Sequence, residues 1–112
     1  MKKHLIYAME GEQMCFLHAL MNADQLQTAG YEVKIIIEGA ACKLIPVLEA
    51  DGNRLYLKLK ENGTIKGVCL ACSKMLGVYE DNEKSGIPFL SDMNGHAGMK
   101  DLIDQGYEVM VF

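Results

Sequence analysis

The chain has 112 residues, of which 50% are hydrophobic and 23% are charged, and its formal net charge is −4. This length accommodates one domain, residues 1–112, and the composition is that of a globular protein rather than a disordered one. Nucleic acids and anionic membranes are bound through clustered positive charge, and no run of Lys or Arg extends beyond Lys2-Lys3, so we expect neither as a partner.

The N-terminal residues predict a strand followed by a long helix. Leu5 to Met9 is a short, continuous apolar run, as expected for a strand buried on both faces. The run is too short for a secretory or membrane-spanning segment, and we therefore expect a cytoplasmic protein. Glu12 to Ala29 carries apolar residues at helical spacing, and Gly30 supplies a C-terminal stop.

The next residues predict two further strands with helices between them. Tyr31 to Ile37 is rich in β-branched residues and is expected to be the second strand. Ala40 to Ala50 is expected to be partly helical, with Pro46 forcing a late start or a kink. Asn53 can cap the next helix, and Thr64 to Leu70 is expected to be the central strand of the sheet.

The C-terminal residues predict shorter elements. A helix is expected to open at Ala71 or Cys72, and Glu80 to Glu83 is expected to form a solvated acidic turn. Ile87 to Leu90 follows as a short strand, and the segment that starts at Asn94 leads into a helix through Gln105. Gly106 to Phe112 repeats the glycine-tyrosine start of the second strand and completes a last strand.

Strands that alternate with helices through short connections indicate a mainly parallel sheet with helices on both faces. The predicted fold is α/β, a three-layer α/β/α sandwich with about five strands. In such sheets, ligands and reactive groups collect beyond the carboxyl ends of the strands. Those ends are the loops Glu10–Cys15, Glu38–Cys42, Cys69–Cys72 and Ser91–His96. All four cysteines and two of the three histidines fall in or near these loops, so we expect a site at this edge of the sheet.

The strongest chemical signal is the pair in Cys69-Leu70-Ala71-Cys72, at the predicted strand-to-helix turn. In a reducing compartment, cysteines are more often thiols, ligands or catalytic groups than disulfides. A helix N-terminus favours the thiolate, which is the reactive form of cysteine. The residues alone leave three roles open: a persulfide carrier, a dithiol redox pair or half of a metal site. The alternative is that both cysteines pack as small hydrophobic residues.

Two histidines are further candidates. Cys15 and His18 are three residues apart, so they share a helix face, and with Cys69 and Cys72 they form a four-ligand set of the type that zinc accepts. His18 can equally be a core histidine with a local hydrogen bond. His96, in a glycine-rich loop beyond a strand, can supply a proton or stabilise a thiolate, or it can be a solvated helix-entry residue.

The segment from Glu61 to Cys69, with Gly77-Val78 and Gly86-Ile87-Pro88 after it, resembles a block of the DsrE/DsrF-like family of small sulfur-relay proteins. The order of the other elements also matches, so the resemblance covers nearly the whole chain. It implies a parallel-sheet α/β fold, assembly into trimers or hexamers, and Cys69 as the acceptor of sulfane sulfur. Cys72 departs from the better-known carriers, which often have a non-thiol residue there. A second thiol can resolve a persulfide or convert the site to metal binding.

These observations predict a sulfur carrier or sulfurtransferase-like protein that needs no cofactor and acts between donor and acceptor proteins as a homo-oligomer. Cys69 is then the nucleophile, Cys72 an auxiliary thiol and His96 the proton donor. The alternative is a non-catalytic interaction module or a module that binds zinc or iron, built on Cys15, His18, Cys69 and Cys72. A thiol–disulfide redox protein is a third hypothesis.

Overall fold

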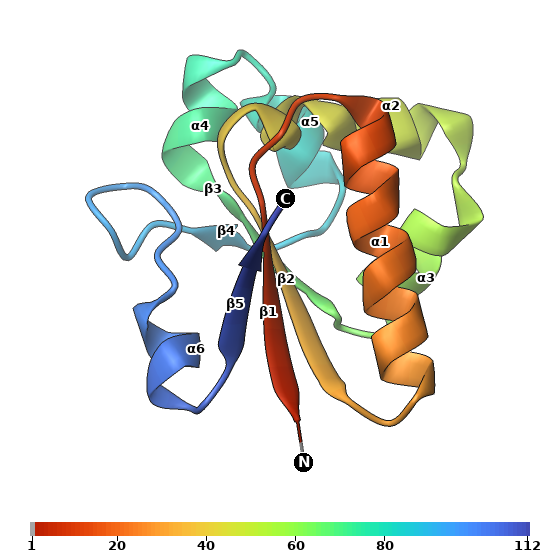
Figure 1. The fold of residues 1–112 in the computed structure, drawn as a ribbon. Coiled ribbons are helices and arrows are strands. Elements are labelled where there is room, and N and C mark those ends of the chain that lie inside the picture. The colour runs from red at the N-terminus through yellow and green to blue at the C-terminus, as the bar shows by residue number, and fades with distance from the viewer. Residues whose placement is uncertain (1) are drawn as a thin grey trace.

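The central feature of the fold is a sheet of five parallel strands (Figure 1). The computed structural model describes residues 2–112, and Met1 lies outside the described part. In their order across the sheet, the strands are β4 (Phe89–Leu90), β3 (Ile65–Cys69), β2 (Glu32–Ile37), β1 (Lys3–Ala8) and β5 (Glu108–Val111). All pairings between them are parallel, which confirms the predicted α/β fold.

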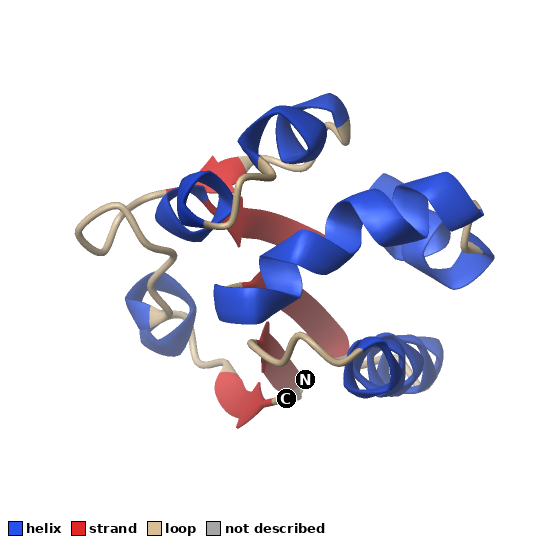
Figure 2. Ribbon diagram, turned by 90° about the horizontal axis from the view of Figure 1, so that it is seen from above, coloured by secondary structure: helices blue, strands red, loops and turns tan. Residues whose placement is uncertain are grey.

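Helices connect the strands and lie on both faces of the sheet (Figure 2). They are α1 (Gln13–Thr28), the 3-10 helix η1 (Gly39–Lys43), α2 (Leu44–Asp51), α3 (Arg54–Glu61), α4 (Leu70–Met75), α5 (Tyr79–Lys84) and α6 (Lys100–Asp104). The connections from β1 through β2 and β3 to β4 are right-handed and cross the sheet in one direction, so their helices lie on the same face of the sheet. The connection from β4 to β5 crosses the sheet in the opposite direction and therefore places α6 on the other face. Figure 2 shows α1 and α3 on one face and α6 opposite, which makes three layers. No helix among residues 2–112 combines the length and the apolarity needed to cross a membrane.

The hydrophobic core lies between the sheet and its helices. β2 supplies Ile35, Ile36 and Ile37, which are at most 1% exposed, and such a continuous apolar run is typical of a strand buried on both faces. β2 has two strands on either side and is the central strand, so the prediction that residues 64–70 would be central was wrong. The position of β3 depends on a long-range contact. Because β5 pairs with β1, β3 is second from the edge of the sheet, and the local pattern of apolar residues does not reveal this pairing.

Three local sequence signals act in the structure as predicted. Gly30 follows the end of α1 with a φ of +94°, a conformation that glycine adopts without a steric penalty. Asn53 caps α3 by accepting a hydrogen bond from the Tyr56 N–H at 2.9 Å. Pro46 lies in the first turn of α2, which begins only after η1, so its missing N–H breaks no hydrogen bond of the helix.

The acidic segment, residues 80–83, is a helix rather than the predicted turn. It lies within α5, where the side chain of Asn82 is buried instead of solvated. The Asn82 amide donates to the Cys42 carbonyl at 3.1 Å and to Ser73 Oγ at 2.9 Å. These tertiary contacts stabilise a helix in a segment whose composition alone is typical of a turn.

The helix expected to follow Asn94-Gly95-His96 and run through Gln105 is shorter than predicted, since α6 begins only at Lys100 and ends at Asp104. Asn94 and Gly95 have φ values of +52° and +89°, which lie outside the range of a right-handed helix. His96 therefore lies in an irregular segment, residues 91–99, which we call the His96 loop.

Candidate functional site

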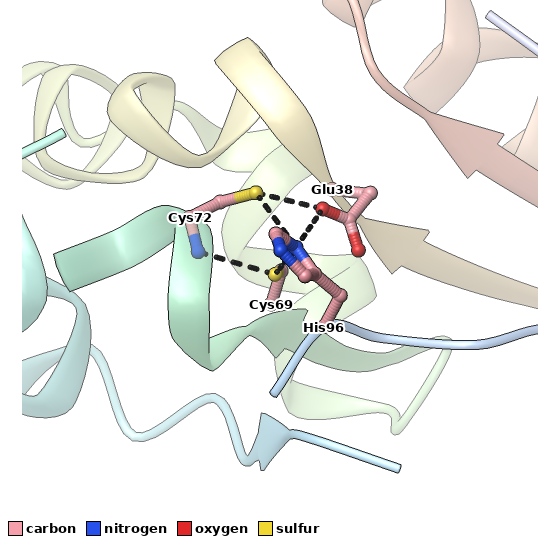
Figure 3. Close-up of side chains that lie close together, drawn as sticks. All are labelled: Glu38, Cys69, Cys72 and His96. Atoms are coloured by element: carbon pink, nitrogen blue, oxygen red, sulfur yellow. Dashed lines mark hydrogen bonds and ion pairs between the residues drawn. The ribbon is translucent and has the colours of Figure 1, made fainter. Parts of the chain in front are cut away.

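The candidate site lies at the carboxyl edge of the sheet, where β3 passes directly into α4. Cys69 is the last residue of β3 and the N-cap of α4, and its Sγ accepts the Cys72 N–H at 3.2 Å. Ser73 Oγ donates to the Cys69 carbonyl at 2.8 Å and fixes this first turn. Both thiols point toward His96 (Figure 3). The structure thus brings together the three residues that we expected to be catalytic.

His96 reaches the thiols because its loop is folded back on itself. Met93 and His96 exchange two backbone hydrogen bonds of 2.9 Å, and the Gly95 carbonyl accepts the Ala71 N–H at 2.9 Å, which ties the loop to α4. His96 Nδ1 lies 3.2 Å from the Sγ of Cys69. It lies 3.4 Å from the Sγ of the second cysteine of the pair. The imidazole is therefore in contact with both sulfur atoms.

The fourth member of the site is Glu38, which sequence reasoning did not single out. It directly follows β2, and its buried Oε1 accepts the Gly39 N–H at 2.9 Å and the Cys72 Sγ proton at 2.7 Å. Its Oε2 accepts the Ala97 N–H at 2.9 Å and lies 3.4 Å from the Tyr7 hydroxyl. The one available signal was its position, since Glu38 is the first polar residue after three isoleucines at the carboxyl edge.

One potential ligand atom from each of Glu38, Cys69, Cys72 and His96 lies within 4.8 Å of all the others (Figure 3). Three of these side chains are buried, whereas 37% of the His96 side chain is exposed. The protein core therefore covers one side of the cluster, and the His96 imidazole lies on the side that faces solvent. Two thiols beside an imidazole and a carboxylate can act as a nucleophilic site, in which a cysteine sulfur accepts a transferred group, or they can bind a metal ion.

Burial sets the protonation of the cluster. It raises the pKa of Cys69, with the Cys72 N–H acting in the opposite direction. It also raises the pKa of Cys72 strongly, and the neighbouring Glu38 carboxylate adds to that effect. Burial alone would raise the pKa of Glu38, but hydrogen bonds from Cys72 and Gly39 outweigh it and hold this pKa below its usual range. The resting site thus consists of two protonated thiols beside an ionised carboxylate.

Cys15 and His18 do not join the cluster. Both are exposed on α1, because the same helix turns Phe16 and Ala19 into the core. Three-residue spacing does place Cys15 and His18 near each other along the helix, but on its solvent side. The four-ligand set that we predicted with these two residues is not assembled, and Glu38 and His96 lie beside the cysteine pair in their place.

Fold and site together define a class of protein: a parallel α/β domain with a buried thiol pair and a histidine at the carboxyl edge of its sheet. Within that class, the chain belongs to the family of the uncharacterised protein MJ0733 of Methanocaldococcus jannaschii. It is 33% identical to that protein over 97 residues, which are 84% of this chain and 77% of the relative. An uncharacterised protein of Archaeoglobus fulgidus is 42% identical over 52 residues, or 46% of this chain and 84% of that protein. No family model matches the chain, and no solved structure matches it.

Proposed function

We propose that the protein is a sulfur carrier that accepts sulfane sulfur as a persulfide on Cys69. The observation that carries this proposal is the environment of the Cys69 Sγ, which accepts the Cys72 N–H and contacts His96 Nδ1, each at 3.2 Å. An N–H donor and an imidazole are groups that stabilise a sulfur anion. The resemblance to the DsrE/DsrF-like family gives the cysteine at this position the same role and supports the proposal.

Neighbouring charge distinguishes the two thiols. Cys72 Sγ lies 2.7 Å from Glu38 Oε1, so an anion on Cys72 would face a carboxylate at contact distance. The Cys69 Sγ also lies within 4.8 Å of a Glu38 oxygen, but its shortest contacts are with the Cys72 N–H and His96 Nδ1. Cys69 is therefore the better sulfur acceptor, and Cys72 is the auxiliary thiol.

In the proposed step, His96 takes the proton of the Cys69 thiol, the resulting thiolate attacks the terminal sulfur of a persulfide donor, and the S–S bond of the donor breaks. The donor leaves as a thiol after taking a proton from His96, and Cys69 carries the persulfide. Transfer to an acceptor thiol by the same exchange returns Cys69 to its starting state. If Cys72 attacks the Cys69 Sγ instead, hydrogen sulfide is released and the two thiols are oxidised to a disulfide as the sulfane sulfur is reduced.

Access to Cys69 requires movement of the His96 loop. The Cys69 side chain is fully buried, and Cys72 is 9% exposed. The half-exposed His96 lies between these sulfur atoms and solvent. A donor therefore reaches Cys69 when the His96 loop swings aside, and the loop closes again over the persulfide.

The same resemblance supports a setting for this activity. We propose that the protein acts in the cytoplasm, between protein donors and acceptors of sulfur, as a homotrimer or homohexamer. Light scattering on the purified protein measures the assembly directly. A monomer at cellular concentrations contradicts the oligomeric part of the proposal and leaves the chemistry of Cys69 untouched.

The test of sulfur transfer uses reduced protein that has been freed of metal with a chelator. Cys15 is exposed and would take up sulfur nonspecifically, so a Cys15→Ser background is used. Incubation with a low-molecular-weight persulfide should add ~32 Da, one sulfur atom, to the intact mass. The adduct should disappear in Cys69→Ala and persist longer in Cys72→Ala. If folded protein takes up no sulfur, or keeps its adduct in Cys69→Ala, the proposal is wrong.

A further inference from the structure

We infer that Glu38, Cys69, Cys72 and His96 also form a binding site for one zinc(II) ion. This inference goes beyond sulfur transfer and does not rest on it, because it concerns the metal-loaded form of these side chains. It is carried by the identity of the donor atoms, their mutual distances and the contacts that orient them.

The donor atoms are those that zinc prefers. Thiolate sulfur, imidazole nitrogen and carboxylate oxygen are its usual protein ligands, and tetrahedral sites with four such ligands are common. All four come from residues at the carboxyl edge of the sheet: Glu38 after β2, the cysteine pair at the β3–α4 junction, and His96 from its loop (Figure 3). Three of the four ligand residues are buried.

Three of the six distances between the donor atoms, those from His96 Nδ1, are close to the distances in a tetrahedral site, and all six are within 4.8 Å. Zinc bonds of about 2.0–2.3 Å place tetrahedral ligand atoms about 3.3–3.8 Å apart. His96 Nδ1 lies 3.2 Å from the Cys69 Sγ, 3.4 Å from the Cys72 Sγ and 3.4 Å from Glu38 Oε1. The remaining short contact, 2.7 Å between Cys72 Sγ and Glu38 Oε1, is a hydrogen bond whose proton leaves when the thiol binds metal. An ion therefore fits after a small expansion of the cluster.

Contacts outside the four ligands already fix their directions. The Cys72 N–H donates to the Cys69 Sγ at 3.2 Å, an arrangement that leaves the other lobes of this sulfur free for a metal. The Ala97 N–H holds Oε2 of Glu38 at 2.9 Å, so that Oε1 is the oxygen turned toward the thiols. Such supporting contacts position metal ligands and raise affinity.

Zinc and sulfur compete for the same thiols. A zinc ion needs Cys69 as a thiolate ligand, and a zinc-bound thiolate inside a buried four-ligand site is not open to a sulfur donor. Zinc occupancy therefore gives the closed, protected form of the thiols, and sulfur transfer belongs to the metal-free form. Iron(II) should bind the same ligands more weakly, in keeping with the general order of divalent metal affinities.

The experiment adds zinc chloride to reduced, metal-free protein in competition with a chromophoric chelator. We expect one tightly bound zinc per chain. Affinity should fall about 100-fold or more in Cys72→Ser and in His96→Asn, each of which removes a ligand. The matched control is the double variant Cys15→Ser/His18→Gln, which alters the exposed pair on α1 and should bind zinc like the parent protein.

Circular dichroism checks that each variant is folded, and His96→Asn lies in a loop, where it is least disruptive to the core. The charge-transfer absorption of the cobalt(II)-substituted protein reports thiolate ligation independently of affinity. Less than one zinc per chain in folded parent protein, or zinc affinity unchanged in both ligand variants, overturns the inference. The persulfide assay uses metal-free protein, so each proposal can fail without the other.

Discussion

The backbone N–H of Ala97 donates a hydrogen bond of 2.9 Å to Oε2 of Glu38, and so ties the residue after His96 to the end of β2. The other oxygen of this carboxylate, Oε1, accepts the proton of the Cys72 thiol. One side chain thus anchors the His96 loop and faces the cysteine pair at the same time. The position of the imidazole over the thiols depends on contacts made outside the cysteine motif.

Tyr7 is the second anchor of the His96 loop, and its loss should loosen the site. The buried Tyr7 hydroxyl donates to the Ala97 carbonyl at 2.6 Å, so Tyr7→Phe leaves a buried acceptor without a partner. We expect a loss of about 1–2 kcal/mol in the free energy of unfolding, measured in urea. We also expect about 10-fold weaker zinc binding, because His96 is less well positioned. Tyr79→Phe, at an exposed hydroxyl, is the control. Zinc affinity equal to the parent in Tyr7→Phe would show that Tyr7 does not position the loop.

Zinc should block sulfur uptake, because both require Cys69. Protein loaded with one equivalent of zinc should form little of the adduct of ~32 Da, and a chelator added afterwards should restore it. Intact mass spectrometry follows both steps in the Cys15→Ser background. In that background, sulfur uptake at an equal rate with and without bound zinc would mean that metal and sulfur do not share the thiol.

Gly67 of β3 is required by the close approach of the neighbouring edge strand. A Cβ at this position would overlap the Leu90 side chain and would lie 2.9 Å from the Pro88 carbonyl oxygen. Gly67→Ala should therefore cost about 1–3 kcal/mol in the free energy of unfolding. Because Leu90 is one of the two obstacles, the added cost should be smaller in a Leu90→Ala background. Additive effects in this double-mutant cycle would contradict the steric explanation.

Glu49 should make stability depend on pH in the acidic range. Burial alone would raise the pKa of Glu49, but hydrogen bonds from Lys60 at 2.6 Å and Tyr56 at 2.7 Å hold it below its ordinary 4.5. A carboxylate with a lowered folded-state pKa contributes stability above its unfolded pKa and loses it as the pH falls through the folded value. Glu49→Gln should thus cost about 1 kcal/mol at pH 7, and this cost should shrink as the pH falls through the folded-state pKa of Glu49.

Chemical or thermal unfolding at a series of pH values measures this difference. Glu108→Gln, at an exposed position of β5, is the matched control and should show no such pH-dependent loss. A Glu49→Gln penalty that stays constant from neutral pH down to the pH at which the parent protein unfolds would assign the effect to packing rather than to charge.

The order of strands and helices was largely predictable because the signals for it are local. Gly30 and Asn53 mark helix ends through their own backbone and side-chain chemistry, and Cys69 and Cys72 are close together in the sequence. Strand position within the sheet was not predictable in this way. Whether β3 is central depends on where β5 pairs, a contact between the two ends of the chain.

The residues of the site also differ in whether local sequence signals could identify them. Cys69, Cys72 and His96 were found from their motif and their loop, but Glu38 was missed because a carboxylate after a strand is an ordinary feature. Its significance comes from Ala97, 59 residues away, and from Cys72, 34 residues away. Cys15 was wrongly predicted to join the site. Helical spacing determines which residues share a face of the helix, but not which face is buried against the core.

The parallel pairing of β1 with β5 has a practical consequence for handling the protein. The Phe112 carbonyl accepts the N–H groups of Met9 and Glu10 at 2.7 Å and 3.2 Å, so the chain ends at the carboxyl edge of the sheet, the edge that holds the thiols. A polyhistidine tag joined there would start on that edge and offer competing imidazoles to any metal. β1 starts at the opposite edge (Figure 1), so a purification tag for metal titrations belongs at the N-terminus.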